Sequence, residues 1–275
     1  SYPKSGNTLV RSMLSSYFFS KDGIFNFDLL NNIKKFPDFG VFKTLGIDIT
    51  NENEVIKNYI NVQKEINKRD GNSIRFLKTH AALNDINGYR FTDLKNTLGA
   101  IYIVRDPRKI ILSYANHSQI TLSESLKRLI ELRTIGGLND NQNQSVTHVG
   151  SWSTNYHSWK EFNKVGKYLL IKYEDLISKP EDNLKLILEF ISKITNTKLE
   201  VDKKKLSNVL STTSFEYLQK LEKENNFPEA IKKKDGNYAT FFKYGKKNTG
   251  KNLPEEITRE LEDNLSSEMK ELGYL

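Results

Sequence analysis

The sequence begins with a short segment whose residue types suit the binding of a phosphate. Residues 1–8 read SYPKSGNT, directly before an apolar stretch with helical spacing. Gly6 permits a tight turn, in which backbone N–H groups would converge at the positive end of the following helix. Lys4 would add a full positive charge, and the hydroxyls of Ser5 and Thr8 would add donors. Taken alone, the segment also fits a surface turn with a helix N-cap at residue 7 or 8.

This segment differs from the nucleotide-binding loop of kinases and GTPases. That loop reads GxxxxGK[ST], with the lysine after its second glycine, whereas here Lys4 precedes Gly6. No aspartate at a predicted strand end is placed to hold magnesium either. The sequence therefore predicts a phosphate site formed by the backbone amides at the start of a helix, without that motif.

Two further segments place basic side chains at the ends of predicted strands. In FLKTH, Lys78 and His80 are two residues apart, so they share one face of a strand. In VRDPRKIILS, Arg105 lies where a strand meets a helix. Open α/β sheets bind ligands at such carboxyl ends. The alternatives are a packed or surface histidine and an ion pair between Arg105 and Asp106 or another carboxylate.

The elements that would position these side chains alternate between helices and strands. This order predicts an α/β fold in three layers, with a central parallel sheet flanked by helices. We expect one domain over residues 1–275, without its native first strand, because a phosphate loop normally follows a strand. The stretch 136–150 is polar and predicts a mobile loop. The predicted helices cover 7–20, 52–69 (exposed and amphipathic), a segment capped by Asp106 with Pro107 next, 153–164, 180–193 and 254–272; the predicted strands cover 73–78, 100–104 and 168–173.

Composition narrows the choice of partners. The chain has 42 Lys and Arg against 34 Asp and Glu, a net charge of +8, which favours an anionic partner such as a nucleic acid, a membrane surface or a small phosphorylated ligand. There is no cysteine, which is compatible with a reducing, cytoplasmic location. The four histidines have no metal-ligand spacing, and no apolar run is long enough for a membrane span. We expect neither a metal nor a nucleic-acid partner, since no interleaved Arg–aromatic motif is present.

Taken in order, these segments closely resemble the signature segments of the sulfotransferases that use 3′-phosphoadenosine 5′-phosphosulfate (PAPS). Each motif is weak alone, but the ordered set is specific and spans nearly the whole chain. It implies a fold of the P-loop nucleotide-binding type. It also implies transfer of a sulfuryl group from PAPS to the hydroxyl or amine of a small-molecule acceptor, which leaves adenosine 3′,5′-bisphosphate (PAP). The matching segments are YPKSGNT, LKTH, R-x7-S within VRDPRKIILS, GSW at 150–152, YEDL at 173–176, TSF at 213–215 and FFKYG at 241–245.

The resemblance also implies a role for individual residues. His80 would be the general base of an in-line displacement, with Lys78 near the transferred group. Lys4 would neutralise charge on the departing oxygen. No metal ion is required, because the sulfuryl group carries less charge than a terminal phosphate. The implied cofactor contacts are Lys4, Ser5, Gly6, Asn7 and Thr8 at the 5′-phosphosulfate, Arg105, Ser113, Lys243 and Gly245 at the 3′-phosphate, and Tyr173 and Phe215 at the adenine.

Two positions depart from the family pattern. Leu9 stands where a tryptophan usually stacks on adenine, and residues 243–245 read KYG where RKG is usual. Both departures bear on cofactor affinity. The dimerisation stretch K-x-x-x-T-V of animal cytosolic members is not visible, which leaves the oligomeric state open.

The acceptor is open at this point. The aromatic-rich segment 17–42 and the loop 136–150 would shape its pocket, although most of these aromatic residues are expected in the core. An alcohol or phenol, a lipid-like hydroxyl and a sugar all remain as acceptors. Two other functions stay as alternatives, a nucleotide kinase or NTPase and a basic nucleic-acid-binding protein.

Overall fold

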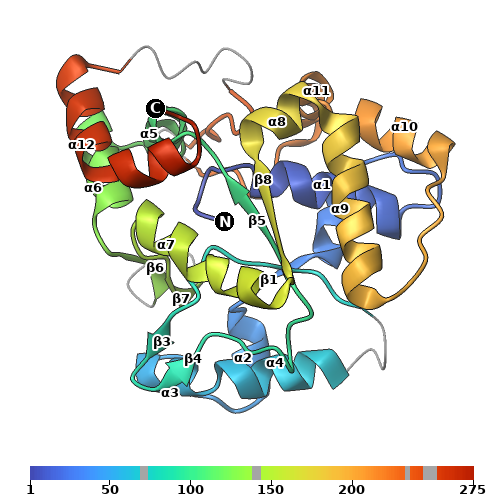
Figure 1. Ribbon diagram of the computed structural model, residues 1–275, viewed down its shortest axis with the longest axis horizontal. Coiled ribbons are helices and arrows are strands. Elements are labelled where there is room, and N and C mark those ends of the chain that lie inside the picture. Colours follow the sequence, from blue (N-terminus) through green and yellow to red (C-terminus); the bar gives the residue numbers. More distant parts are fainter. Residues whose placement is uncertain (69–73, 138–143, 233–235, 244–252) are drawn as a thin grey trace.

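The computed structural model describes residues 1–68, 74–137, 144–232, 236–243 and 253–275 (Figure 1). Two parallel strands run side by side through its middle, β5 (Ala100–Val104) and β8 (Tyr168–Lys172). Their register pairs each residue of one strand with one residue of the other, from Ala100 with Tyr168 to Val104 with Lys172. A second parallel pair joins β1 (Lys34–Lys35) to β2 (Leu77–Lys78).

The two faces of the β5–β8 pair are buried against different helices. Tyr102 and Val104 belong to a core shared with α5 (Pro107–Ser118), α6 (Leu122–Ile130), α7 (Trp152–Trp159) and α12 (Glu255–Glu271). Ile103 belongs to a core shared with α1 (Asn7–Phe19) and α9 (Pro180–Thr195). Successive side chains of a strand point to opposite faces, so an apolar run such as AIYIV suits burial on both. Figure 1 shows these two groups of helices on opposite sides of the strands. The predicted three-layer arrangement is confirmed.

The elements follow the predicted order with some changes in length. The helices are α1 (Asn7–Phe19), η1 (Phe27–Asn32), α2 (Phe39–Thr44), α3 (Glu52–Lys57), α4 (Tyr59–Lys68), α5 (Pro107–Ser118), α6 (Leu122–Ile130), α7 (Trp152–Trp159), η2 (Lys160–Val165), α8 (Tyr173–Ser178), α9 (Pro180–Thr195), α10 (Lys203–Thr212), α11 (Phe215–Asn225) and α12 (Glu255–Glu271). The remaining strands pair antiparallel, β3 (Asp85–Ile86) with β4 (Tyr89–Arg90) and β6 (Thr134–Gly137) with β7 (Gln144–His148). In the described part of the chain, no helix is long and apolar enough to cross a membrane.

Three predictions about elements were wrong. The segment 52–69 forms two helices that part at Asn58, and Val62 is fully buried, because this segment packs its apolar face into the core. The strand predicted over 73–78 is reduced to β2. The stretch 136–150 contains strand residues on both sides of 138–143, which lie outside the described residues.

The cap of α5 agrees with the sequence, whereas the cap of α1 does not. The Asp106 carboxylate accepts a hydrogen bond from the Arg108 amide, and Pro107 follows at the first helical position. In α1 the N-cap is Gly6, in a left-handed conformation and without any side-chain cap. The first amides of α1 therefore have no capping side chain, which bears on the site described next.

Candidate active site

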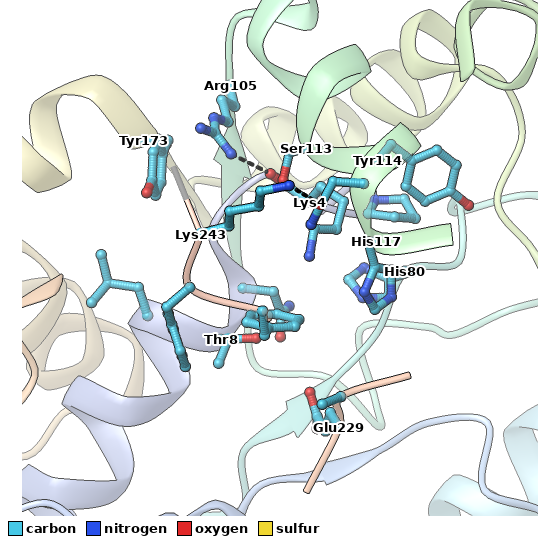
Figure 2. Close-up of a pocket in the computed structure, with 18 of the residues that line it drawn as sticks. Lys4, Thr8, His80, Arg105, Ser113, Tyr114, His117, Tyr173, Glu229 and Lys243 are labelled. Carbon is cyan, nitrogen blue, oxygen red and sulfur yellow. Dashed lines mark hydrogen bonds between the residues drawn. The ribbon is translucent and has the colours of Figure 1, made fainter. Parts of the chain in front are cut away.

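A cavity of about 1330 Å³ opens where β2, β5 and β8 end and α1 begins (Figure 2). Most of the residues that the sequence proposed for the site line it. Two do not: Ser5 is fully buried beneath the loop, and Gly245 lies outside the described residues. The proposed residues on the cavity wall are Lys4, Gly6, Asn7, Thr8, Lys78, His80, Arg105, Ser113, Tyr173, Phe215 and Lys243.

The loop before α1 has a backbone conformation that few residue types adopt. Lys4 and Gly6 both have positive φ angles, of 66° and 107°. A Cβ atom at Gly6 would lie 2.5 Å from the Tyr173 ring, so glycine is required there by its φ angle and by space. The Ser5 hydroxyl is buried without a hydrogen-bond partner. The uncapped amides at the start of α1 fit an anionic ligand in the cavity.

The Lys4 side chain lies inside the cavity, against an aromatic ring. Its Nζ is 3.7 Å from the centroid of the Phe241 ring. Burial and, to a smaller degree, the nearby Arg105 charge lower the pKa of Lys4 to about 7. An anion bound beside it would restore the charged form, because an opposite charge favours the protonated amine.

His80 is held in one orientation by the start of the chain. Its Nδ1 lies 2.8 Å from the Ser1 carbonyl oxygen, and the carboxamide of Asn155 donates to the His80 carbonyl at 3.0 Å. Since a carbonyl only accepts, Nδ1 carries the proton and Nε2 keeps its lone pair. Burial lowers the pKa of His80 well below its usual value, so the ring is neutral. A neutral imidazole with Nε2 available can accept a proton.

Lys78 is paired with an acidic residue that the sequence motifs did not include. Its Nζ lies 3.3 Å from both carboxylate oxygens of Glu229, which also accepts from Arg11 at 2.6 Å. Burial on its own would raise the pKa of Glu229, but the charges of Lys78 and Arg11 outweigh it and lower that pKa. No motif surrounds Glu229, and it lies far from both partners in sequence, so spacing gave no signal for it.

Arg105 is buried at the end of β5, and Asp106 is not its partner. Its guanidinium lies 4.2 Å from the centroid of the Tyr173 ring, and Nη1 donates to the Lys4 carbonyl at 3.0 Å. Its Nε is buried without a partner. Asp106 instead pairs with Arg108 at 3.0 Å, so the alternative of an Arg105–Asp106 ion pair is not observed. Arg105 is left able to bind a ligand.

The helix α5 brings further residues to the same cavity. Ser113 lies on the wall near Arg105, and Lys243 donates to Asn116 at 2.9 Å. His117 also lies on the wall, although the sequence gave it no role. Burial and the charge of Lys4 lower the pKa of His117 to about 3, so it too is neutral.

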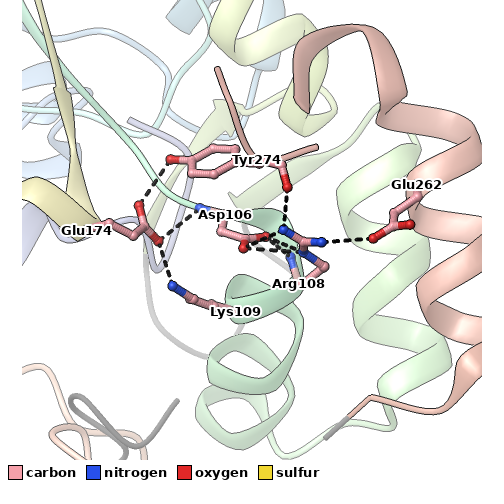
Figure 3. A network of polar contacts seen from close by, with 6 residues as sticks. All are labelled: Asp106, Arg108, Lys109, Glu174, Glu262 and Tyr274. Carbon is pink, nitrogen blue, oxygen red and sulfur yellow. Dashed lines mark hydrogen bonds and ion pairs between the residues drawn. The ribbon is translucent and has the colours of Figure 1, made fainter. Parts of the chain in front are cut away.

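The two strand ends are tied together behind the cavity by a polar network (Figure 3). Glu174 accepts hydrogen bonds from the Asp106 amide at 3.3 Å and from the Tyr274 hydroxyl at 3.1 Å. Arg108 donates to the Tyr274 carbonyl at 2.7 Å and pairs with Glu262 of α12 at 3.0 Å. Because Asp106 follows Arg105 and Glu174 follows Tyr173, the network fixes the backbone beside both of these cavity residues.

The predicted acceptor pocket is only partly correct. From the aromatic-rich segment 17–42, Lys35 alone lines the cavity among the described residues. Phe25, Phe36 and Phe42 are at most 2% exposed and belong to the hydrophobic cores. From 136–150, the described part contributes Gly136. The wall is therefore more polar than these aromatic residues would have made it.

Residues 1–273 match the sulfotransferase domain family, and the chain belongs to that family. Rat sulfotransferase 2A6 is 30% identical over 130 residues, which cover 46% of this chain and 39% of the rat protein. The match thus spans less than half of that curated relative's length. In the described residues, no group of three or more His, Cys, Asp or Glu side chains is placed to hold a metal ion.

Two solved structures share the fold at low sequence identity. Mouse sulfotransferase SULT7A1 complexed with PAP has a TM-score of 0.54 and 15% identity over 98% of this chain and 82% of its own. Retinol dehydratase in complex with androsterone and the inactive cofactor PAP has a TM-score of 0.59 and 16% identity over 98% of this chain and 79% of its own. The predicted α/β fold, of the P-loop nucleotide-binding type that is consistent with this family, is confirmed.

Proposed function

We propose that this protein transfers the sulfuryl group of PAPS to an acceptor hydroxyl or amine, in a cavity that binds both molecules. One observation carries the proposal. The loop with Lys4 before the uncapped start of α1, the buried Arg105 and the neutral His80 all line the same cavity. The family match and the PAP complexes of the structural relatives support it.

The residues present fit the two separated phosphate groups of PAPS. The amides of residues 5–8 and the charge of Lys4 would hold the 5′-phosphosulfate. Arg105 would hold the 3′-phosphate together with Ser113 and Lys243, because its Nε is buried without a partner. Tyr173 and Phe215 would contact the adenine, with Leu9 on the same wall.

The chemistry needs one proton acceptor and one group that stabilises the leaving oxygen. His80 Nε2 takes the proton of the acceptor hydroxyl while its oxygen bonds to sulfur and the bond from sulfur to the bridging oxygen breaks. Lys4 neutralises the charge that grows on that bridging oxygen, and Lys78 would lie near the transferred group. The products are the sulfated acceptor and PAP. The absence of cysteine supports the cytoplasm as the place of this reaction.

The proposal is tested by incubating the protein with PAPS and pooled acceptors and recording mass spectra. We expect one acceptor, or a group of related ones, to gain one sulfuryl group while PAP accumulates in equal amount. Magnesium-dependent hydrolysis of ATP, with no use of PAPS, would contradict the proposal and favour a nucleotide kinase or NTPase.

A further inference from the structure

The cavity has two ends with different surroundings. Figure 2 shows Arg105 and Tyr173 on one side and His80 with Tyr114 on the other. If PAP fills the side of Arg105, as the proposed function requires, the acceptor has to lie around His80 and Tyr114. The side chains near Tyr114 therefore select the acceptor.

Two arginines lie against the Tyr114 ring. The guanidinium carbon of Arg133 is 5.2 Å from the ring centroid, and that of Arg128 is 5.5 Å away. Both residues line the cavity. Planar guanidinium groups stack on aromatic faces in this way and keep their N–H groups available for a ligand.

The two arginines differ in their partners. Arg128 is paired with Glu124 at 3.3 Å, whereas Arg133 forms no ion pair with an acidic side chain in the described part of the chain and has the buried Tyr2 hydroxyl as its polar neighbour. Moreover, Nη1 of Arg133 is buried without any hydrogen-bond partner. A buried cationic donor without a partner is costly, so its retention indicates a ligand that supplies the missing acceptor.

The backbone holds Arg133 in place before any ligand binds. Its carbonyl accepts hydrogen bonds from the amides of Val149 and Gly150, at 3.0 and 3.1 Å. These contacts join the start of β6 to the end of β7. They fix the backbone from which the Arg133 side chain extends, so the ligand has only that side chain to order.

We propose that Arg133 binds an anionic group of the acceptor, so that the preferred acceptors are hydroxylated molecules with a second, oxyanionic group. This inference rests on the proposed function. The fork of N–H groups in arginine matches the two oxygens of a carboxylate or the oxygens of a sulfonate or phosphate. The scarcity of apolar side chains from segment 17–42 on the wall agrees with an acceptor of this class.

The experiment compares acceptors that differ only in the anionic group. One set is 4-hydroxyphenylacetate, 4-hydroxyphenylmethanesulfonate and 4-ethylphenol, and a second is glucuronate and glucose. Binding to the protein saturated with PAP is measured by calorimetry, and kcat/KM is measured with PAPS. We expect the anionic members to be favoured by about 10- to 100-fold in both measurements, the range for hydrogen bonds to one charged group. Comparison of 4-hydroxyphenylmethanesulfonate with 4-hydroxyphenylacetate shows whether a sulfonate or a carboxylate binds better.

Variants of Arg133 separate this role from a structural one. In Arg133→Gln, the ratio of affinities for the anionic and neutral acceptors should fall close to one, while PAP affinity stays unchanged. Arg133→Lys should keep part of the preference for the anionic acceptors. Arg259→Gln is the matched control, because Arg259 is an exposed arginine of α12 that pairs with Glu255 and does not line the cavity. It should leave the preference as it is.

Equal binding of the neutral and anionic members, binding of none of the anionic members, or a preference that survives in Arg133→Gln would overturn the inference. In each of these cases the proposed function stands as long as PAP binds and any acceptor is sulfated. Failure of the protein to bind PAP would instead contradict the proposed function.

Discussion

At the scale of single residues, His80 is the side chain whose surroundings bear most directly on the chemistry. His80→Ala should lower kcat by about 10²- to 10⁴-fold, the usual effect of losing a general base. PAP affinity should stay within a factor of two or so, because the ring is not among the residues that would hold the phosphates. Turnover and calorimetry on the same preparation check both expectations. An unchanged kcat would remove His80 from the mechanism.

Arg105 should decide how tightly the cavity binds a 3′-phosphate. Arg105→Ala should cost about 2–5 kcal/mol of PAP affinity, the range for truncating one partner of a desolvated charge pair. Lys109→Ala is a control a few residues further along the chain, in α5, since Lys109 pairs with Glu174 behind the cavity. Calorimetric titration with PAP measures both variants. An Arg105 variant that binds PAP as wild type does would show that this arginine is structural.

The lowered pKa of Lys4 gives PAP binding a pH dependence. With a pKa of about 7 in the free protein, Lys4 loses its proton as the pH rises from 7 to 9, whereas bound phosphate favours the charged form. Binding above pH 7 must then take up a proton, and the Kd should rise by up to about tenfold per pH unit. Calorimetry in two buffers of different ionisation enthalpy measures the proton uptake. The Lys4→Met variant should bind PAP more weakly, with a Kd that does not change with pH. If its Kd still rises as steeply with pH, the proton is taken up by a group other than Lys4.

The sequence predicted part of the site at this scale. Lys78 and His80 both line the cavity as predicted, although β2 ends at Lys78 and His80 lies just beyond it, and Arg105 reaches the cavity because β5 ends there. Glu229, His117 and Arg133 were not predicted. Their positions depend on how distant segments pack, and no local spacing records that packing.

At the scale of elements, the network of Figure 3 joins the starts of α5 and α8 to the C-terminal segment. Tyr274→Phe removes the hydrogen bond that Glu174 accepts from the Tyr274 hydroxyl and should lower the free energy of unfolding by about 0.5–1.5 kcal/mol. Chemical denaturation measures the change. Tyr238→Phe is the control, because Tyr238 is 53% exposed. An equal loss in both variants would show that the network adds nothing to stability.

The strands and helices that were predicted best are those fixed by a local sequence pattern. The apolar runs of β5 and β8 are buried on both faces, and Asp106 with Pro107 starts α5 as its residue types require. The segment 52–69 was predicted wrongly, because its helical periodicity continues across Asn58 while the chain there breaks into α3 and α4. The strands β6 and β7 were missed, since their polar composition reads as a loop and only their mutual pairing makes them strands.

At the scale of the whole molecule, the fold brings three strand ends and one helix start to a single cavity. The net charge of +8 suits an anionic ligand, but charge alone does not choose among anions. Under the proposed function the positions of the two phosphates do, because Arg105 would bind the 3′-phosphate and the loop of residues 4–8 would bind the 5′-phosphate. The central claim is therefore that the cavity recognises a nucleotide with a 3′-phosphate as well as a 5′-phosphate.

The affinity of the wild-type protein for PAP relative to adenosine 5′-monophosphate tests that claim most directly, since it needs no acceptor. The two ligands differ only by the 3′-phosphate. Charge-assisted hydrogen bonds to that group should make PAP bind about 10- to 100-fold more tightly in a calorimetric titration without metal. Equal affinities, or a preference for ATP that appears only with magnesium, would contradict the account.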